Sequence, residues 1–349
     1  MEIDLKLNKR KVVRESIYYD CPFCNDTKGH LNIHPAKGVY RCNRCGTGGT
    51  LNSLKRELNI PQSSKPEFKP AKKLNPQLEM ASIEVRHKTY SQLLRRLPLL
   101  ERHRVNLLDR GLTDKEIRKL GYKSIPRRFN SILADKLLRS GCELEGVSGF
   151  YHSKKNGWTF YSPSSGILIP FRDEKGRIKS LQVRADKKKE GPRYKWVSSA
   201  GFWHGAPVDT SPHITIGGLS KSTVVLTEGA LKADVAAFLS KRKNVSWVGI
   251  AGVNNTGKLA ELLRKVDIDT ALLEAFDMDK FQNENVKKAT ERMTELIKKE
   301  GFAIQSLIWD GTSKGIDDAL LERKLNVSLR LNEERKSSKG GKRLKSQNK

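Results

Sequence analysis

The chain has 349 residues, 37% of them hydrophobic, and its 67 Lys and Arg against 39 Asp and Glu give a formal net charge of +28. No segment reaches the roughly 18 consecutive apolar residues of a transmembrane helix, and the basic residues 1–16 are not followed by the apolar region of a secretory signal, so we expect a cytoplasmic protein with no membrane association. The positive charge favours a polyanionic partner, most simply nucleic acid, and a merely solubilising surface is the alternative.

Composition divides the chain into five segments. Residues 1–60 contain paired cysteines, and residues 61–80 are rich in Pro, Ser and Lys, which predicts an extended linker. Residues 81–215 are basic, with a helical pattern followed by strands, and residues 216–325 alternate between strand and helix patterns. Residues 326–349 are basic and poor in apolar residues, which predicts a disordered tail.

Four cysteines form two CxxC pairs in the first segment, within "CPFC" and "CNRC". Four thiolates in a tetrahedral array suit one zinc ion with no open coordination position. We therefore predict a single structural Zn²⁺ bound by Cys21, Cys24, Cys42 and Cys45. A redox dithiol is the alternative reading of an isolated CxxC pair. The fifth cysteine, Cys142, is most simply a small buried apolar residue.

The cysteine segment also carries polar and basic residues. His30 and His34 alternate with apolar residues, which favours the polar face of a strand for both, and a role as spare metal ligands is the alternative. Arg41 and Arg44 add positive charge beside the second cysteine pair. This mixture suits contact with single-stranded nucleic acid, and an ordinary solvated face is equally compatible with it.

Two local patterns stand out in residues 81–215. In "LTDKEIRKLGY", Thr113 and Glu116 have the spacing of a capping box, and Gly121 is placed to end the helix. In residues 166–186, two β-rich runs surround a polar turn, which predicts a β-hairpin.

The alternation in residues 216–325 predicts a mostly parallel sheet flanked by helices, in which functional groups collect at the carboxyl ends of the strands. The predicted strands are residues 222–229, 245–252, 270–276 and 302–310, and the predicted helices are residues 230–243, 256–266 and 284–301.

Acidic residues follow three of these strands. Glu228 ends the first strand, Asp277 and Asp279 follow the third, and Asp317 and Asp318 follow the last. Carboxylates gathered at one sheet edge suit a hard divalent cation such as Mg²⁺ or Mn²⁺, whereas any one of them alone is compatible with an ordinary surface acid. Glu274 has the opposite strand parity to Asp277, so we expect it to stay out of the site.

Two sets of motifs resemble DnaG-type primases of bacteria, phages and mobile elements. "CPFC", "KGVYRC" and "CGTGG" are similar to the N-terminal zinc-binding domain of that family, in which His often stands at the position of Cys24. The Glu-Gly turn at Glu228 and the Asp-x-Asp pair at Asp277 and Asp279 resemble a Toprim domain. The resemblance implies that these three acids are catalytic and bind Mg²⁺ or Mn²⁺, with Asp317 or Asp318 as a further ligand.

One position departs from the family pattern. Primases usually have an aspartate four residues after the glutamate, where this chain has Lys232, and Asp234 is nearby but offset. Lys232 would either face a nucleotide phosphate or be an ordinary surface lysine of the helix.

The segment from residue 167 to residue 207 resembles the basic half of the primase catalytic core. The resemblance implies that Arg172, Arg184 and Lys195 line the groove for template or nucleotide. Fixed cations beside a metal cluster are suited to holding phosphates.

The fold expected from these features is α/β, or α+β overall: an N-terminal zinc ribbon, a basic α+β subdomain and a Toprim domain with a Rossmann-like, mostly parallel sheet. The resemblance implies a DNA primase that makes short RNA primers on a single-stranded DNA template from ribonucleoside triphosphates. "GVNNTGKLA" lacks the Ser or Thr of a P-loop, so a replicative helicase partner would be a separate chain. A Toprim nuclease and a non-catalytic DNA-binding replication protein are the alternatives.

Overall fold

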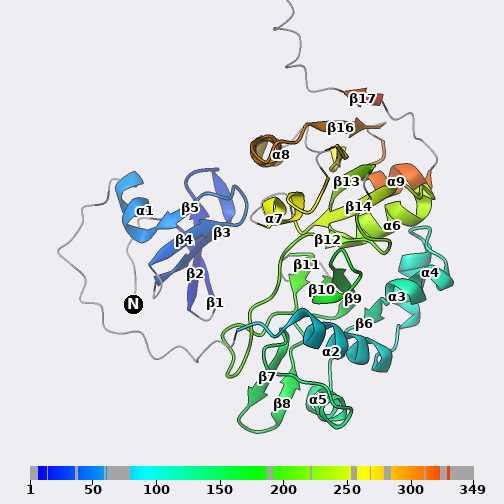
Figure 1. Cartoon of the computed structure of the whole chain (residues 1–349). Coiled ribbons are helices and arrows are strands. Elements are labelled where there is room, and N and C mark those ends of the chain that lie inside the picture. The colour runs from blue at the N-terminus through cyan, green and yellow to red at the C-terminus, as the bar shows by residue number, and fades with distance from the viewer. Residues whose placement is uncertain are drawn as a thin grey trace, which may run out of the picture.

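The computed structural model describes residues 7–13, 15–35, 38–58, 60, 79–186, 192–220, 222–252, 258–267, 269–278, 284–309, 312–322 and 328–330. The predicted linker up to residue 78, and the predicted tail apart from residues 328–330, lie outside these ranges. Figure 1 shows a small β-rich module at the N-terminus and a larger body formed by the rest of the chain. No helix within the described ranges is long and apolar enough to cross a membrane.

The N-terminal module is a five-stranded antiparallel sheet with the strands in chain order. Buried and half-buried residues alternate along β2, as expected for a strand with one face on the core. Its elements are β1 (Lys9–Val13), β2 (Ser16–Cys21), β3 (Asp26–His34), β4 (Val39–Cys42), β5 (Gly48–Thr50) and α1 (Leu51–Glu57).

The body begins with a basic half built on a four-stranded sheet of order β11-β10-β9-β6 and a separate β7-β8 hairpin. The predicted hairpin is confirmed as the antiparallel pair β9 and β10. The elements are α2 (Ile83–Arg96), α3 (Glu101–Leu108), α4 (Asp114–Leu120), β6 (Lys123–Ser124), α5 (Asn130–Arg139), β7 (Phe150–Ser153), β8 (Gly157–Phe160), β9 (Gly166–Arg172), β10 (Ile178–Ala185) and β11 (Tyr194–Trp196).

The local signals in this half form the predicted structures. Thr113 caps α4, with the reciprocal capping-box bond from Glu116, and Gly121 ends the helix with a φ of 76°, in the left-handed region that favours glycine. Cys142 is buried in the core cluster of this half, as predicted.

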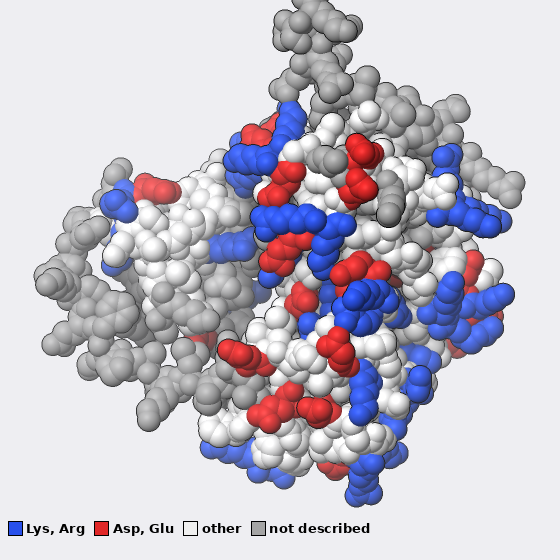
Figure 2. Space-filling view, in the orientation of Figure 1, with Lys and Arg blue, Asp and Glu red and all other residues white. Residues whose placement is uncertain are grey.

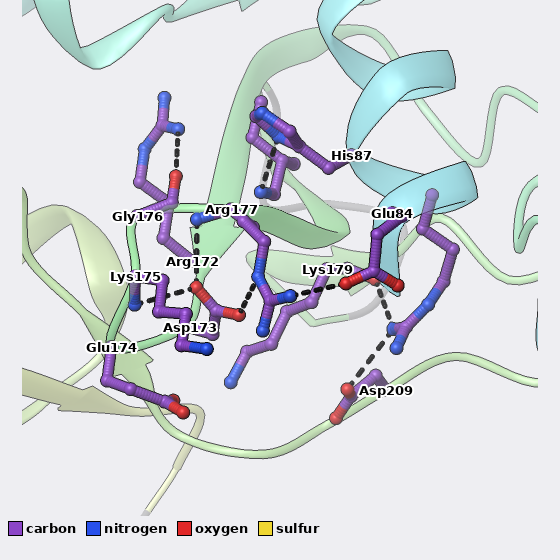
Figure 3. Close-up of polar contacts among 12 residues, drawn as sticks. Glu84, His87, Arg172, Asp173, Glu174, Lys175, Gly176, Arg177, Lys179 and Asp209 are labelled. Carbon is purple, nitrogen blue, oxygen red and sulfur yellow. Dashed lines mark hydrogen bonds and ion pairs between the residues drawn. The ribbon is translucent and has the colours of Figure 1, made fainter. Parts of the chain in front are cut away.

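Charged residues anchor the β9–β10 turn and the segment that follows β11 (Figure 3). Asp173 accepts bonds from the backbone and side chain of Arg177, which also contacts Glu84 at 2.6 Å. Lys179 donates from its buried amine to Ser211 Oγ and Pro212 O, both at 2.6 Å. These bonds hold the connection between the two halves of the body against β10, and burial lowers the pKa of Lys179 to about 8.

The second half is a six-stranded sheet of order β12-β14-β13-β15-β16-β17. The four central strands are parallel, and β12 and β17 are antiparallel edge strands. The elements are β12 (His213–Ile214), β13 (Thr223–Glu228), α6 (Ala230–Ser240), β14 (Val245–Ile250), α7 (Leu259–Leu263), β15 (Ala271–Ala275), α8 (Glu284–Lys299), β16 (Ile304–Ile308), α9 (Ile316–Leu321) and β17 (Ser328–Arg330).

Helices cover both faces of this sheet. Leu226 of β13 packs with residues of α7 and α8, whereas its neighbour Val225 packs with residues of α6 and α9. A third core cluster joins α6 to α3, α4 and β9, so the two halves of the body share a continuous apolar contact. The predicted α/β fold is confirmed, and the carboxyl ends of β13 and β15 lie next to each other in it.

On the face shown in Figure 2, Lys and Arg side chains are spread over both halves of the body. Asp and Glu lie among them, so the net positive charge does not form one uninterrupted patch on this face.

Candidate active site and cysteine cluster

Glu228 and Asp277 lie at the ends of adjacent parallel strands. The pairing of β13 with β15 ends at Thr227 and Ala275; Glu228 is the next residue of β13, and Asp277 lies two residues after Ala275. Glu228 is half-buried and Asp277 is 6% exposed. The sheet therefore places the strand ends that carry Glu228 and Asp277 side by side, whereas Asp279 lies outside the described residues.

A lysine from the following helix is bonded to Asp277. Gly229, with a φ of 90°, turns the chain from β13 into α6. Lys232 is the third residue of α6 and therefore lies in its first turn. Its Nζ donates a hydrogen bond to Asp277 Oδ1. Lys314 Nζ lies 4.0 Å from the other carboxylate oxygen, and Met278 N–H donates to Lys314 O at 3.0 Å, joining the loops that carry the two residues.

Asp317, in the first turn of α9, lies close to Lys232. Its side chain is 3% exposed and Oδ2 accepts a 2.9 Å bond from Arg110 Nη1. Its Oδ1 is buried and has no hydrogen-bond partner among the described residues. Burial raises the pKa of Asp317, while the charges of Lys232 and Arg110 oppose that rise.

Asp318 and Glu274 have other positions. Asp318 is exposed and its Oδ2 accepts a weak 3.4 Å bond from Gly315 N–H at the start of α9. Glu274 is buried and Oε1 accepts a 2.6 Å bond from Phe276 N–H. Of the two aspartates after the last parallel strand, Asp317 is thus the one placed near Lys232.

The predicted groove residues lie deeper than expected. Arg172 is 9% exposed, and its guanidinium donates to Gly176 O and Leu120 O, so it links α4 to the hairpin inside the fold and not along an open groove. Arg184 is half-buried and donates to Asn106 Oδ1 at 3.0 Å. Burial lowers the pKa of both arginines. Lys195 is half-buried in β11, opposite Val183.

Asp234 belongs to a buried polar chain and not to the acid cluster. Its two oxygens accept from Tyr122 Oη at 2.6 Å and from His213 Nε2 at 3.0 Å. His213 Nδ1 accepts from Arg172 N–H at 3.0 Å, so the ring proton lies on Nε2, which donates to Asp234. These hydrogen bonds connect the segment between α4 and β6 with β9, β12 and α6, at the contact between the halves.

Sequence reasoning missed two cations of the site and one contact. Arg110 and Lys314 carry no local motif, because they reach the acids only through the tertiary fold, Arg110 across 207 residues. Lys232 was expected to face a phosphate or solvent, and it bonds to Asp277 instead, with a side chain only 21% exposed. The proximity of "SKGIDD" to the last strand was the one signal that could have indicated Lys314.

The four predicted cysteine ligands form one cluster. Their sulfur atoms all lie within 4.8 Å of one another, and the Cys21–Cys45 and Cys24–Cys42 pairs are 3.9 Å apart. Zinc–sulfur bonds of about 2.3 Å make the edge of a tetrahedron about 3.8 Å, so the spacing suits one tetrahedral ion. Arg44 N–H and Cys45 N–H donate to Cys42 Sγ, at 3.3 and 3.5 Å, and so hold this sulfur atom in the cluster.

The other polar residues of the module lie as the alternation predicted. His30 Nδ1 is 2.8 Å from Asp26 Oδ1, and His34 Nε2 is 3.5 Å from Glu15, so both rings are engaged away from the sulfur cluster. Arg41 is exposed, and Arg44 is exposed with one nitrogen 3.2 Å from Asp26.

Comparison with known proteins agrees with this arrangement. Residues 219–326 match a family described as a domain of unknown function, DUF3854. The chain is 23% identical to the DNA primase of Thermotoga maritima over 185 residues, covering 50% of this chain and 32% of the primase. It is 23% identical to the DNA primase of Lactococcus lactis over 201 residues, covering 52% of this chain and 30% of the primase. The matches thus span about a third of the length of these relatives.

Two solved structures have a similar fold. The zinc-binding and RNA polymerase domains of the Aquifex aeolicus primase superpose with a TM-score of 0.52 at 17% identity, covering 94% of this chain and 84% of that chain. The RNA polymerase domain of Mycobacterium tuberculosis DnaG, in complex with a double-stranded DNA oligomer with a six-nucleotide overhang, gives a TM-score of 0.52 at 16% identity, covering 70% and 78%. The resemblance expected from the sequence is confirmed: this chain is similar in sequence to DNA primases and has the fold of the zinc-binding and RNA polymerase domains of the DnaG type.

Proposed function

We propose that this chain is a DNA primase, a nucleotidyltransferase that makes short RNA primers on single-stranded DNA from ribonucleoside triphosphates. The observation that carries the proposal is that β13 and β15, which lead to Glu228 and Asp277, end side by side at the carboxyl edge of the parallel sheet, within a primase-like fold. Related DNA primases in the sequence comparison support the same reading over a nuclease.

The donor set fits a hard divalent cation. All candidate ligand atoms are carboxylate oxygens, the kind that Mg²⁺ and Mn²⁺ prefer. Asp317 Oδ1 is a buried acceptor without a partner in the described part of the chain, as expected of an atom that lacks its ligand. We assign the cation to Glu228, Asp277 and Asp279, with Asp317 at its edge.

A bound cation would supply positive charge to the triphosphate and to the attacking 3′-hydroxyl. The protein's own cations have a separate task. Lys232 bonds to Asp277 and Arg110 bonds to Asp317, so these two cations hold the carboxylates in position. Lys314, 67% exposed, extends from the loop before α9 and is placed to meet a phosphate group at the mouth of the site.

The cysteine cluster would hold one structural Zn²⁺ and keep the N-terminal module folded. We propose that the module contacts the template through its exposed basic residues, Arg41 and Arg44 among them. We assign Lys195 of the edge strand β11 and Arg184 of the neighbouring strand β10 to the proposed template groove, while Arg172 serves inside the fold. A replicative helicase would be a separate partner.

Template-dependent incorporation of labelled ribonucleotides by the zinc-loaded protein tests the proposal. Short products that appear only with single-stranded DNA and Mg²⁺ or Mn²⁺ are expected. Degradation of the DNA without synthesis would instead establish a nuclease, and binding without either reaction would establish a non-catalytic replication protein.

A further inference from the structure

Lys232 has an unusual position for a helix lysine. It begins on the helix that follows the Glu228 strand, yet its ammonium group is bonded to Asp277 of the neighbouring strand. Its side chain is 21% exposed and that of Asp277 only 8%, so the pair is largely shielded from water. A shielded pair of this kind is a fixed feature of the site and not a loose surface contact.

Lys232 also borders Asp317. A Cβ built on Gly315 would lie 2.5 Å from Asp317 Oδ1, 3.2 Å from Lys232 Cε and 3.3 Å from Lys232 Nζ. Lys232 Nζ and Asp317 Oδ1, which has no hydrogen-bond partner among the described residues, therefore border the same small space. This space exists because residue 315 is a glycine and has no side chain. The charge of Lys232 acts on Asp317 as well, since it opposes the rise in the pKa of that carboxyl group.

The two buried aspartates of the site, Asp277 and Asp317, already have positively charged side chains beside them. Asp277 has Lys232 and, at 4.0 Å, Lys314, while Asp317 has Arg110. Glu228, at the end of the neighbouring strand β13, brings further negative charge to this edge of the sheet. A divalent cation placed between Asp277 and Asp317 would displace the ammonium of Lys232 or be repelled by it at short range.

We propose that Lys232 is a built-in counter-ion of the acid cluster, which occupies the side of Asp277 that faces Asp317 and limits the cluster to one divalent cation. The inference deepens the proposed function and rests on it for the identity of the site. Lys232 thereby acts as a positioning residue, which holds the Asp277 carboxylate in place beside Asp317 whether or not the divalent cation is bound.

Counting bound Mn²⁺ tests this directly. Full-length, zinc-loaded protein is titrated with Mn²⁺ and the free ion is followed by electron paramagnetic resonance. One Mn²⁺ is expected to bind to the wild type, and two to Lys232→Asp, which exchanges the ammonium for a further carboxylate. Lys314→Gln is the matched control, because it removes an exposed cation near the same aspartate, and it should still bind one.

A second variant covers the case in which Lys232→Asp does not fold. Lys232→Met keeps an unbranched stem of similar length without the charge. Its Mn²⁺ affinity should rise about tenfold, because the competing cation is gone, and its melting temperature without Mn²⁺ should fall. Unchanged Mn²⁺ affinity would show that Lys232 has only a structural role.

The outcomes separate the inference from the proposed function. Two Mn²⁺ ions bound to the wild type would overturn the inference and leave primer synthesis intact. One bound Mn²⁺ without any primer synthesis would overturn the proposed function and leave the inference standing. No Mn²⁺ bound to any of the proteins would overturn both.

Discussion

At the scale of single residues, the site depends on ion pairs between residues far apart in the chain, which no local sequence pattern predicts. The placement of acids after β13 and β15 at one sheet edge was predictable, because the carboxyl ends of neighbouring parallel strands lie at the same edge. Their cationic partners were not predictable, because Lys232 and Arg110 reach them across 45 and 207 residues. Arg172 shows the same limit, since its sequence context suggested a groove and its burial makes it structural.

The pair of Arg110 and Asp317 gives a stability prediction. Arg110→Ala would leave the buried Asp317 carboxylate without its partner, and we expect a loss of about 3 kcal/mol in the free energy of unfolding. Denaturant titration of the wild type and the variant measures this difference in the free energy of unfolding. The matched control is Arg104→Ala, whose partner Asp114 is 41% exposed, so the loss should be below about 1 kcal/mol. Equal losses in the two variants would contradict the role assigned to Arg110.

Lys179 gives a prediction of pH dependence. Its pKa is about 8 in the folded protein and near the usual 10.5 in the unfolded chain, so the unfolded state binds more protons between these values. Stability should therefore rise with pH from about 8 to about 10.5, by about 3 kcal/mol at 1.36 kcal/mol per pKa unit. Below pH 8 the amine is protonated in both states and its burial costs stability in full.

The comparison variant is Lys179→Met, which removes the titrating amine from the same buried position. Unfolding free energies measured for both proteins at pH 7.5 to 10.5 should differ in slope, with the rise missing from the variant. Parallel curves for the two proteins would show that the amine does not titrate in this range.

At the scale of elements, the strong local patterns were correct and the weak ones were missed. The four parallel strands, the capped helix α4 and the β9–β10 hairpin follow from periodicity, capping and turn residues. The edge strands β12 and β17 were not predicted, because strands of two and three residues form only by pairing with β14 and β16. The β7–β8 hairpin was missed as well, since its aromatic residues pack against the later loop that contains Phe202.

The N-terminal module gives a prediction at this scale. Among the residues that the structure describes, its core cluster has eight buried apolar residues, including Cys21 and Cys42, so we expect its folding to require the metal. Removal of zinc with a chelator should abolish hydrogen-exchange protection in β2, β3 and β4. Protection in β9, β10 and β13 should remain, because these strands lie in separate cores. Protection retained in β3 without zinc would show that the cysteine cluster is not structural.

At the scale of the whole molecule, the order of the structural units along the chain was predictable, whereas the contacts between the two halves of the body were not. Cysteine spacing, the proline-rich stretch and strand–helix alternation predicted a zinc ribbon, a basic half and a parallel sheet, and the similarity to a primase over 94% of this chain agrees with that order. The joining rests on buried side chains from distant segments, such as Tyr122 with Asp234 and the apolar contacts of α6 with α3 and β9. Such contacts depend on the complete fold and leave no periodic trace in the sequence.

We propose that primer synthesis depends on the carboxylates at the ends of β13 and β15. The most direct measurement is the rate of ribonucleotide incorporation on single-stranded DNA by the wild type and by Asp277→Asn, with Glu261→Gln on the exposed surface of α7 as the control. We expect Asp277→Asn to lose at least about 100-fold in rate while still binding the template, and the control to match the wild type. Equal rates for Asp277→Asn and the wild type would contradict the account.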